Sequence, residues 1–164
     1  MPVKAVSPYG SWASPITADI IVAGGLSFSE IRVDGDDVYW LEGRSAEAGR
    51  SVVVRRSIDG EEWDQIPAGF NARTGVHEYG GGVYAVRSGT IYFANWEDQR
   101  IYRVADNASP QALTGLPEVA RGDRYADLTI NGNSQWLCCV RECHRTKGEP
   151  TNDLVAVSVT EPGR

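Results

Sequence analysis

The stretch VYAVRSGTIYFANWEDQRIYRV at residues 83–104 decides how the chain is expected to fold. Its segments 83–86, 91–94 and 100–104 are short, rich in β-branched and aromatic residues, and separated by polar turns. Segments of that length and composition predict β-strands, and the short turns between them favour antiparallel pairing. Residues 111–113 add a fourth segment, so the stretch predicts a meander of four short strands.

The same succession of strands and turns occurs once before this stretch and begins again after it. The equivalent second strands begin at Val38, Ile91 and Gln135, so the repeat spacings are 53 and 44 residues. Propeller blades of four strands repeat every ~40–50 residues, and each second strand here is apolar on both sides, as in stacked sheets. The predicted fold class is all-β: a partial β-propeller of four-stranded antiparallel blades with an irregular N-terminal arm containing at most a short helix.

The repeat also sets the expected domain boundaries. They are an N-terminal arm at 1–27 and an incomplete β-propeller at 28–164, with blade 1 at about 28–66, blade 2 at about 82–114 and a partial blade 3 at about 125–160. In the arm, Thr17 is expected to cap a short helix that Gly24-Gly25 ends. Closed propellers have ~4–8 blades, so two blades and most of a third should leave apolar faces open, which favours self-association.

Composition and charge narrow the function classes. The chain of 164 residues is 41% hydrophobic and 23% charged, which is typical of a soluble globular domain. Its formal net charge of −6 argues against nucleic-acid binding, which needs a basic surface. No apolar run approaches the ~20 residues that span a bilayer, and the first residues show no signal-peptide pattern. We therefore expect a cytoplasmic protein with no membrane or nucleic-acid partner.

The motifs of several enzyme classes are missing from the sequence. Residues 25–29 (GLSFS) lack the final glycine of a hydrolase nucleophile elbow, and residues 80–82 (GGG) lack the lysine and hydroxyl residue of a phosphate-binding loop. Cys138 and Cys139 lie close to His144, but neighbouring strand residues point to opposite faces and the usual zinc spacing is absent. The sequence therefore predicts no catalytic residue, no metal site and no cofactor in this chain.

The segment HEYGGG at residues 77–82 is the most distinctive candidate for a binding site. Its three glycines permit unusual backbone angles and the close approach of another segment. In one interpretation it is a blade-entry loop, in which the glycines serve backbone geometry and the His-Glu pair satisfies buried polar groups. In the other, Glu78 faces a substrate tunnel and binds a peptide α-amino group by a charge-assisted hydrogen bond, with His77 and Tyr79 beside it.

Arg44 and Arg50 are two further candidates for substrate binding. They belong, with Glu42 and Glu47, to a mixed-charge loop that follows an apolar strand. The simpler interpretation is a solvated or salt-bridged hairpin. The alternative is that Arg44 or Arg50 holds a loop against a further domain or reaches a substrate carbonyl.

Several segments of the sequence resemble a known family when they are taken together. They are YGSWASPITAD at 9–19, VYWLEGR at 38–44, EAGR at 47–50, NAR at 71–73, HEYGGG at 77–82, QRIY at 99–102, RYAD at 124–127, and VRE at 140–142 with His144. The family is the acylaminoacyl-peptidase or dipeptidyl-aminopeptidase-like branch of the prolyl oligopeptidase serine peptidases. The resemblance covers essentially the whole chain and departs from the family at Ser45, where proline is expected, and at Cys143, where an acidic residue is expected.

The resemblance implies a parent enzyme in which an N-terminal propeller covers a C-terminal α/β-hydrolase domain with a Ser-Asp-His triad. There the propeller admits only small or unfolded peptides, and the triad cleaves aminoacyl or acylaminoacyl groups from them. No triad residue is expected here, so we interpret the chain as a substrate-gating fragment that lacks its hydrolase domain and is inactive alone. Two alternatives stay open: a stand-alone, self-associating propeller-like binding or scaffold module, and a carbohydrate-binding β-protein that uses Trp12, Trp63 or Trp96.

Overall fold

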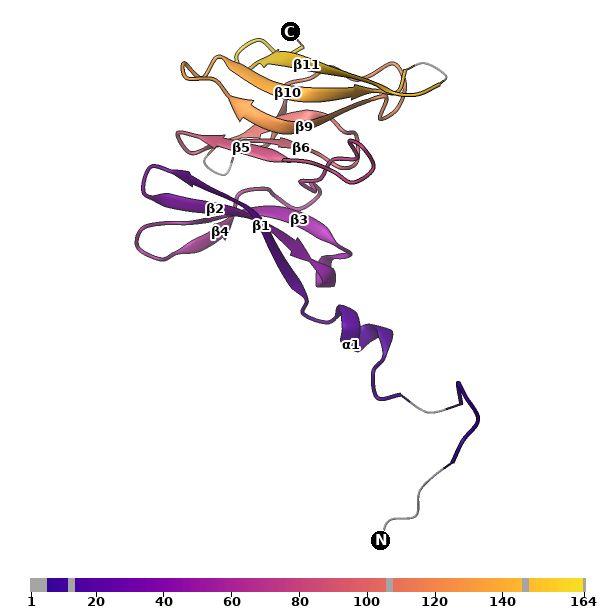
Figure 1. The fold of residues 1–164 in the computed structure, drawn as a ribbon. Helices are drawn as coiled ribbons and strands as arrows, with labels where there is room; N and C mark the ends of the chain where they lie inside the picture. Colours follow the sequence, from indigo (N-terminus) through magenta and orange to yellow (C-terminus); the bar gives the residue numbers. More distant parts are fainter. Residues whose placement is uncertain (1–5, 12–13, 106–107, 146–147, 164) are drawn as a thin grey trace.

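The computed structural model describes residues 6–11, 14–105, 108–145 and 148–163. Their regular structure is almost entirely β, in three antiparallel sheets that stack face to face (Figure 1). The all-β class expected from the sequence is therefore confirmed. Trp12, one of the tryptophans considered for carbohydrate binding, lies outside the described residues.

Each sheet is a meander of strands that follow one another in the sequence. Sheet 1 contains β1 (Leu26–Asp34), β2 (Asp37–Arg44), β3 (Arg50–Arg56) and β4 (Glu62–Asp64), with a short 3₁₀ helix at Ser45–Glu47 between β2 and β3. Sheet 2 contains β5 (Tyr84–Arg87), β6 (Thr90–Ala94), β7 (Ile101–Val104) and β8 (Gln111–Ala112). Sheet 3 contains β9 (Asp123–Ile130), β10 (Trp136–Cys143) and β11 (Thr151–Ser158), with β10 in the middle.

Two hydrophobic cores hold the stack together, one between sheets 1 and 2 and one between sheets 2 and 3. β6 contributes to both, because Ile91 and Phe93 belong to the first core and Tyr92 belongs to the second. Successive side chains of a strand point to opposite faces, so a strand between two sheets must be apolar on both sides. This is the reason that residues 91–94 form a continuous apolar run rather than an alternating one.

Along β1 and the start of β2, the face of sheet 1 that is turned away from sheet 2 is apolar and exposed. Strand register brings Val33 opposite Val38, and Phe28 lies on the same face of the β1–β2 pair. Phe28, Ile31 and Val33 are 63%, 69% and 70% exposed, and Leu26 and Val38 are exposed beside them. We call these five residues the outer apolar face. A sheet face of this kind is normally covered by another layer of structure.

The segment before sheet 1 extends away from the stack and contains α1 (Ala18–Val22), the one α-helix among the described residues (Figure 1). As expected from the sequence, Thr17 caps it: Thr17 Oγ1 accepts a hydrogen bond from the Ile20 N–H at 3.2 Å. The helix ends at Val22 with Ala23 as its C-cap, before Gly24 with its φ of 73°. β1 then begins at Leu26, inside the segment 1–27 that was assigned to the arm.

No helix in the described part of the chain is long and apolar enough to cross a membrane.

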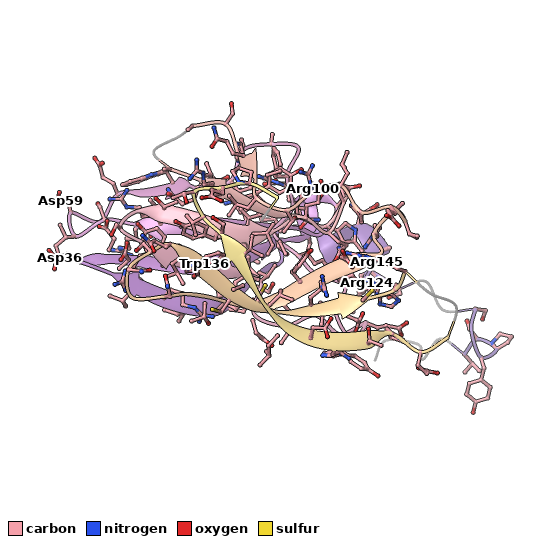
Figure 2. All side chains as sticks on the ribbon, turned by 90° about the horizontal axis from the view of Figure 1, so that it is seen from above. Asp36, Asp59, Arg100, Arg124, Trp136 and Arg145 are labelled. Atoms are coloured by element: carbon pink, nitrogen blue, oxygen red, sulfur yellow. The ribbon has the colours of Figure 1, made fainter. Side chains whose placement is uncertain are left out.

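The strands run across the stack, and we call the two opposite sides at which the strands begin and end the two ends of the stack. These two ends carry different parts of the chain. Asp36 and Asp59 lie at one end, in the turns after β1 and β3, whereas Arg124 and Arg145 lie at the other end (Figure 2). The connections between successive sheets, from β4 to β5 and from β8 to β9, begin and end at the arginine-bearing end. Long connections are the usual carriers of binding residues on a β scaffold, so a binding site is expected at this end.

Candidate functional site

A cavity of about 390 Å³ opens at the arginine-bearing end of the stack. It is formed by the β4–β5 connection, the turn after β6, the β8–β9 connection and the adjoining ends of β9 and β10. Its lining residues are Gly75, Glu78, Trp96, Val119, Ala120, Arg121, Gly122, Arg124 and His144. Of the five residues expected to bind substrate, Glu78 lines this cavity, and the other four do not.

The loop that carries Glu78 has an unusual backbone. His77 and Glu78 have φ values of 53° and 60°, and Gly80 has a φ of 88°. A left-handed conformation costs a residue with a Cβ atom roughly 1–2 kcal/mol. Two such residues in succession persist only where the surrounding structure holds them, and strain of this kind clusters at binding sites.

Close packing against β9 explains the glycines that follow. A Cβ atom at Gly81 would lie 2.9 Å from the Ala126 Cβ, and one at Gly82 would lie 3.1 Å from Asp127 Oδ1. The Gly82 N–H donates to Asp127 Oδ1 at 2.9 Å, and the Asp127 N–H donates to the Gly82 carbonyl at 2.6 Å. The close approach expected of the glycine-rich segment is therefore present, and its partner is sheet 3.

Glu142, at the end of β10, fixes the same loop to sheet 3. Its side chain is 3% exposed, and it accepts a hydrogen bond from the His77 backbone N–H at 2.8 Å. It also contacts His77 Nδ1 at 3.1 Å, His144 Nε2 at 2.5 Å and Arg124 Nη1 at 3.4 Å. Burial acts to raise the pKa of Glu142, but the hydrogen bonds from His144 and the His77 backbone, with the nearby positive charges, lower it overall.

The expected site residues His77 and Tyr79 thus differ from Glu78 in position. The His77 imidazole faces Glu142, so it satisfies a buried polar group as in the first interpretation of this loop. Tyr79 is 97% exposed and does not line the cavity. A role for either side chain in substrate binding stays a prediction.

Glu78 is the acidic group that the cavity presents to solvent. Its side chain is exposed, and it makes no hydrogen bond or ion pair with any described residue. The loop beneath it is anchored on both sides, by Glu142 at residue 77 and by Asp127 at residue 82. A carboxylate held in this way can bind an ammonium group without first breaking an internal ion pair.

Two arginines stack on Trp96 at the edge of the cavity. The Arg121 guanidinium carbon lies 4.3 Å from the centre of the indole ring, and that of Arg73 lies 4.4 Å from it. Arg121 lines the cavity and Arg73 does not. Neither guanidinium has an ion-pair partner among the described residues, and cation–π stacking leaves the N–H groups of a guanidinium free to bind an acceptor.

Arg44 and Arg50 lie away from this cavity, and both are engaged within sheet 1. Arg44 contacts Asp64 at 2.6 Å, Glu42 at 2.7 Å and Glu47 at 3.1 Å. The hydrogen bonds to Asp64 raise the pKa of Arg44 by more than burial lowers it. These contacts are those of the salt-bridged hairpin considered from the sequence. Their use for substrate stays a prediction.

Arg50 joins the β2–β3 hairpin to the start of the β4–β5 connection. Its guanidinium donates to the carbonyls of Phe70 and Ile66, both at 2.8 Å, and pairs with Glu47 at 2.7 Å. Arg50 therefore fixes the loop that follows β4, which belongs to the same sheet as Arg50 itself. Contact with a further domain, as proposed from the sequence, is not among these interactions and stays a prediction.

The cysteines and acidic residues provide no metal centre in the part of the chain that the structure describes: no group of three or more His, Cys, Asp and Glu side chains could hold an ion. Cys138 is exposed and Cys139 is buried, as expected of neighbours on one strand. Burial raises the pKa of the Cys139 thiol to about 12, so this side chain behaves as part of the core.

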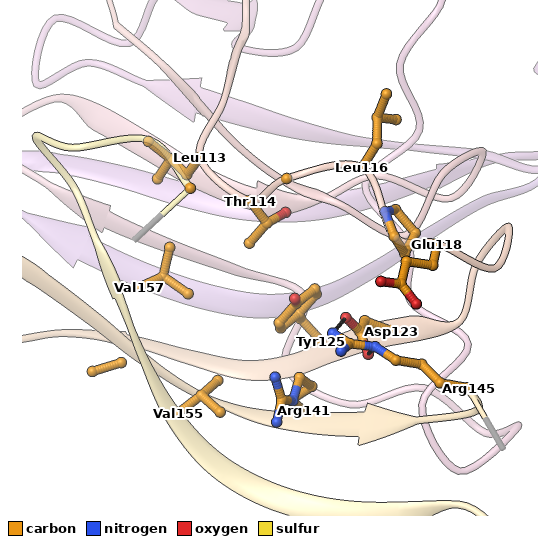
Figure 3. A pocket seen from close by; sticks show the side chains of 14 residues that line it. Leu113, Thr114, Leu116, Glu118, Asp123, Tyr125, Arg141, Arg145, Val155 and Val157 are labelled. Carbon is orange, nitrogen blue, oxygen red and sulfur yellow. Dashed lines mark hydrogen bonds and ion pairs between the residues drawn. The ribbon is translucent and has the colours of Figure 1, made fainter.

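A larger hollow of about 420 Å³ lies beside the β8–β9 connection and sheet 3 (Figure 3). Its apolar side includes Leu113, Val155 and Val157, and its polar side includes Tyr125, whose pKa burial raises to about 12. Both of its arginines are already paired, Arg145 with Asp123 and Arg141 with Asp153. Its exposed carboxylate Glu118 therefore has no unpaired arginine beside it in this hollow. The cavity beside Glu78 combines an acidic and a basic group without internal partners, and it is the stronger candidate for a binding site.

The sequence interpretation missed Arg121, Arg124 and His144 as neighbours of Glu78. Arg124 and His144 belong to segments of the family resemblance, but nothing in their spacing connects them with residue 78. Arg121 is followed by Gly122, a pattern that predicts a turn but gives no reason to expect a binding residue. These residues become a site only because three connections meet at one end of the stack.

Comparisons with known proteins identify what the fold is similar to. No protein-family model matches the chain, and no curated protein matches it. Among solved structures, a puromycin-hydrolyzing peptidase of Mycobacterium tuberculosis is 37% identical with a TM-score of 0.78, over 95% of this chain and 25% of that chain. A puromycin hydrolase is 33% identical with a TM-score of 0.80, over 96% of this chain and 25% of that one.

A variant of puromycin hydrolase complexed with PGG gives the same picture, with 33% identity, a TM-score of 0.80, and coverage of 94% of this chain and 25% of that chain. The matched region is the N-terminal propeller part of these relatives. This chain therefore spans about a quarter of the length of the proteins it is similar to.

Proposed function

We propose that this chain belongs to the prolyl oligopeptidase family, whose motifs it resembles, and that it is the substrate-gating portion of a serine peptidase, because it matches puromycin-hydrolyzing peptidases over their N-terminal propeller part. The three sheets act as successive blades of a ring that further sheets complete. Peptide-bond cleavage, at aminoacyl or acylaminoacyl groups of short peptides, is supplied by a hydrolase domain outside these 164 residues. The chain alone is inactive in this proposal.

The arrangement of the sheets supports the proposal that they are blades of a larger propeller. Sheet 2 packs on both of its faces, against sheet 1 and against sheet 3, as an inner blade does, and the outer apolar face of sheet 1 is left for a further layer to cover. The relatives are about four times as long as this chain, which leaves room for that layer and for a second domain.

The exposed carboxylate of Glu78 is the observation that supports the proposed substrate binding. It is an exposed carboxylate without an internal partner, on a strained loop that Glu142 and Asp127 hold in place, beside a cavity. We propose that it binds the α-ammonium group of a peptide. Of the two substrate classes, such a site favours aminoacyl over acylaminoacyl peptides, because an acylated terminus has no charge and only one N–H donor.

Peptide titration of this chain tests the proposal. Binding of alanyl-alanine amide is compared with binding of its N-acetylated form by isothermal titration or NMR at about pH 6.5, where the α-amino group is protonated. Acetylation is expected to weaken binding roughly 10–100-fold, the range of a charge-assisted hydrogen bond. The Glu78→Gln variant is expected to bind the amine form as weakly as wild type binds the acetylated form.

Glu61→Gln is the matched control, because Glu61 is also exposed but lies in the β3–β4 turn, at the other end of the stack. It is expected to bind both peptides as wild type does. Equal binding of the free and acetylated peptides to wild-type protein would rule out Glu78 as an amine site.

A second candidate function is a stand-alone binding or scaffold module that self-associates. The outer apolar face favours it, because Phe28, Ile31 and Val33 are more than half exposed on one sheet surface. The two candidates differ in what covers that face: a further blade of the same protein or a second copy of this chain.

A further inference from the structure

The cavity beside Glu78 contains a second charged group without an internal partner, Arg121. It lines the cavity from the β8–β9 connection, whereas Glu78 lines it from the β4–β5 connection. Neither side chain makes a hydrogen bond or ion pair with a described residue. Opposite charges that share a cavity without pairing leave both available to a ligand that carries both charges.

Arg121 is held in place in two ways. Its backbone is left-handed, with a φ of 57°, in a tight turn that the Gly122 N–H closes by donating to the Val119 carbonyl at 2.8 Å. Its side chain stacks on Trp96 at 4.3 Å. The backbone carries strain that the turn must offset, as at Glu78, and the stacked guanidinium is oriented before any ligand arrives.

The surroundings of Arg121 favour an anion. Arg124 and His144 also line the cavity, and Glu142 holds both in position from below. The buried Nε of Arg124 has no hydrogen-bond partner among the described residues. A positive group of this kind is notable in a chain with a net charge of −6, and it would attract the carboxylate of a ligand.

The size of the cavity limits the length of such a ligand. A volume of 390 Å³ corresponds to a sphere about 9 Å across, and an extended peptide advances ~3.3–3.6 Å per residue. An extended di- or tripeptide therefore has about the length scale of the cavity, so its two termini can reach two sides of it.

We propose that Arg121 binds the α-carboxylate of a short peptide whose α-ammonium group binds Glu78. The inference rests on the proposed function of Glu78 and deepens it: the ligands are di- and tripeptides with both ends free. Arg121 then sets an upper limit on peptide length, which an amine site alone does not do.

Four forms of alanyl-alanine test this on the full chain: unmodified, C-amidated, N-acetylated, and blocked at both ends. Amidation is expected to weaken binding roughly tenfold or more, through loss of a charge-assisted, bidentate contact. Arg121→Gln is expected to weaken binding of the unmodified peptide to the same extent and to bind the amide as wild type does. Penta-alanine is expected to bind no better than the dipeptide amide.

Arg73→Gln is the matched control, because Arg73 stacks on the same indole ring without lining the cavity. It is expected to leave all four affinities unchanged. If acetylation weakens binding but amidation and Arg121→Gln do not, the Arg121 proposal fails and the Glu78 proposal stands. If amidation weakens binding but acetylation does not, Glu78 is not the amine site and the pairing of both ends is wrong. The effect of each peptide modification on affinity is measured with wild-type protein, so the test remains valid even if a variant does not fold.

Discussion

At the scale of single residues, the buried Glu142 joins the loop that carries Glu78 to the end of sheet 3. Both histidines of the chain contact its buried carboxylate, and so do Arg124 and the backbone of the loop that carries Glu78. A buried carboxylate is stable only when charge and hydrogen bonds compensate its lost hydration. Removing the charge of Glu142 should therefore loosen the loop and the sheet together.

Glu142→Gln is expected to lower the free energy of unfolding by about 1–3 kcal/mol at pH 7, because charge-assisted hydrogen bonds are replaced by weaker neutral ones. Urea unfolding followed by tryptophan fluorescence measures it. Glu118→Gln, at an exposed carboxylate, should change the free energy by less than about 0.5 kcal/mol.

The pH dependence of the unfolding free energy provides a second, independent test of the role of Glu142. The pKa of Glu142 lies below its ordinary value of 4.5 in the folded protein, so its ionised form stabilises the fold. That stabilisation is complete above the unfolded-state pKa and is lost as the pH falls through the folded-state pKa. The difference in unfolding free energy between wild type and Glu142→Gln should therefore shrink as the pH falls below about 4. A difference that stays constant from about pH 6 to about pH 3 contradicts this account.

At the scale of elements, the approach of the 77–82 loop to β9 shapes the candidate site. Asp127 has a φ of 56°, and the pairing of β9 with β10 shifts register between Cys138 and Val140. Such an irregularity turns a strand residue out of the ladder, which frees the Asp127 backbone N–H to meet the Gly82 carbonyl. The loop can follow this path only if its own residues add no side chain there.

Gly81→Ala is expected to destabilise the fold by about 1–3 kcal/mol, because its Cβ would lie 2.9 Å from the Ala126 Cβ and the loop would have to move. Gly115→Ala is the matched control: a Cβ there meets nothing within 4 Å and the φ of the residue is not left-handed. The midpoints of thermal unfolding of both variants provide the measurement. Equal midpoints would show that the close approach is not required.

At the scale of the whole molecule, sheet 1 presents an apolar surface of a kind that a soluble protein rarely leaves exposed. The outer apolar face of sheet 1 is contiguous across β1 and β2, and the relatives are about four times as long as this chain. In the proposed ring a further blade covers this face. In the chain by itself, water or another copy must do so.

Self-association of the isolated chain is therefore expected to rise with concentration and to fall in the double variant Phe28→Asp, Ile31→Asp, since charge on the face opposes its burial. Sedimentation velocity over a range of concentrations measures it. Ile58→Asp is the control, because Ile58 is 73% exposed in the β3–β4 turn and lies off this face. A wild-type chain that stays monomeric at all concentrations would remove the scaffold candidate.

Local patterns of side chains are enough to predict the layers of this protein. The meanders around Val38, Ile91 and Gln135, the doubly apolar β6 and the cap at Thr17 were all predicted, because side-chain period, turn residues and capping act over a few neighbouring positions. The family resemblance was likewise predicted from short motifs, and the similarity to the N-terminal part of solved peptidases confirms it.

Which charged groups meet depends on how the three sheets stack. Glu142 and His77 are 65 residues apart in the sequence, and Arg44, an expected substrate residue, instead pairs with Asp64 across sheet 1. Side-chain direction at Glu78 and Arg121 depends on left-handed backbone that close packing imposes, and no local pattern encodes such packing. The candidate site therefore exists because stacking three similar sheets brings their connections together at one end.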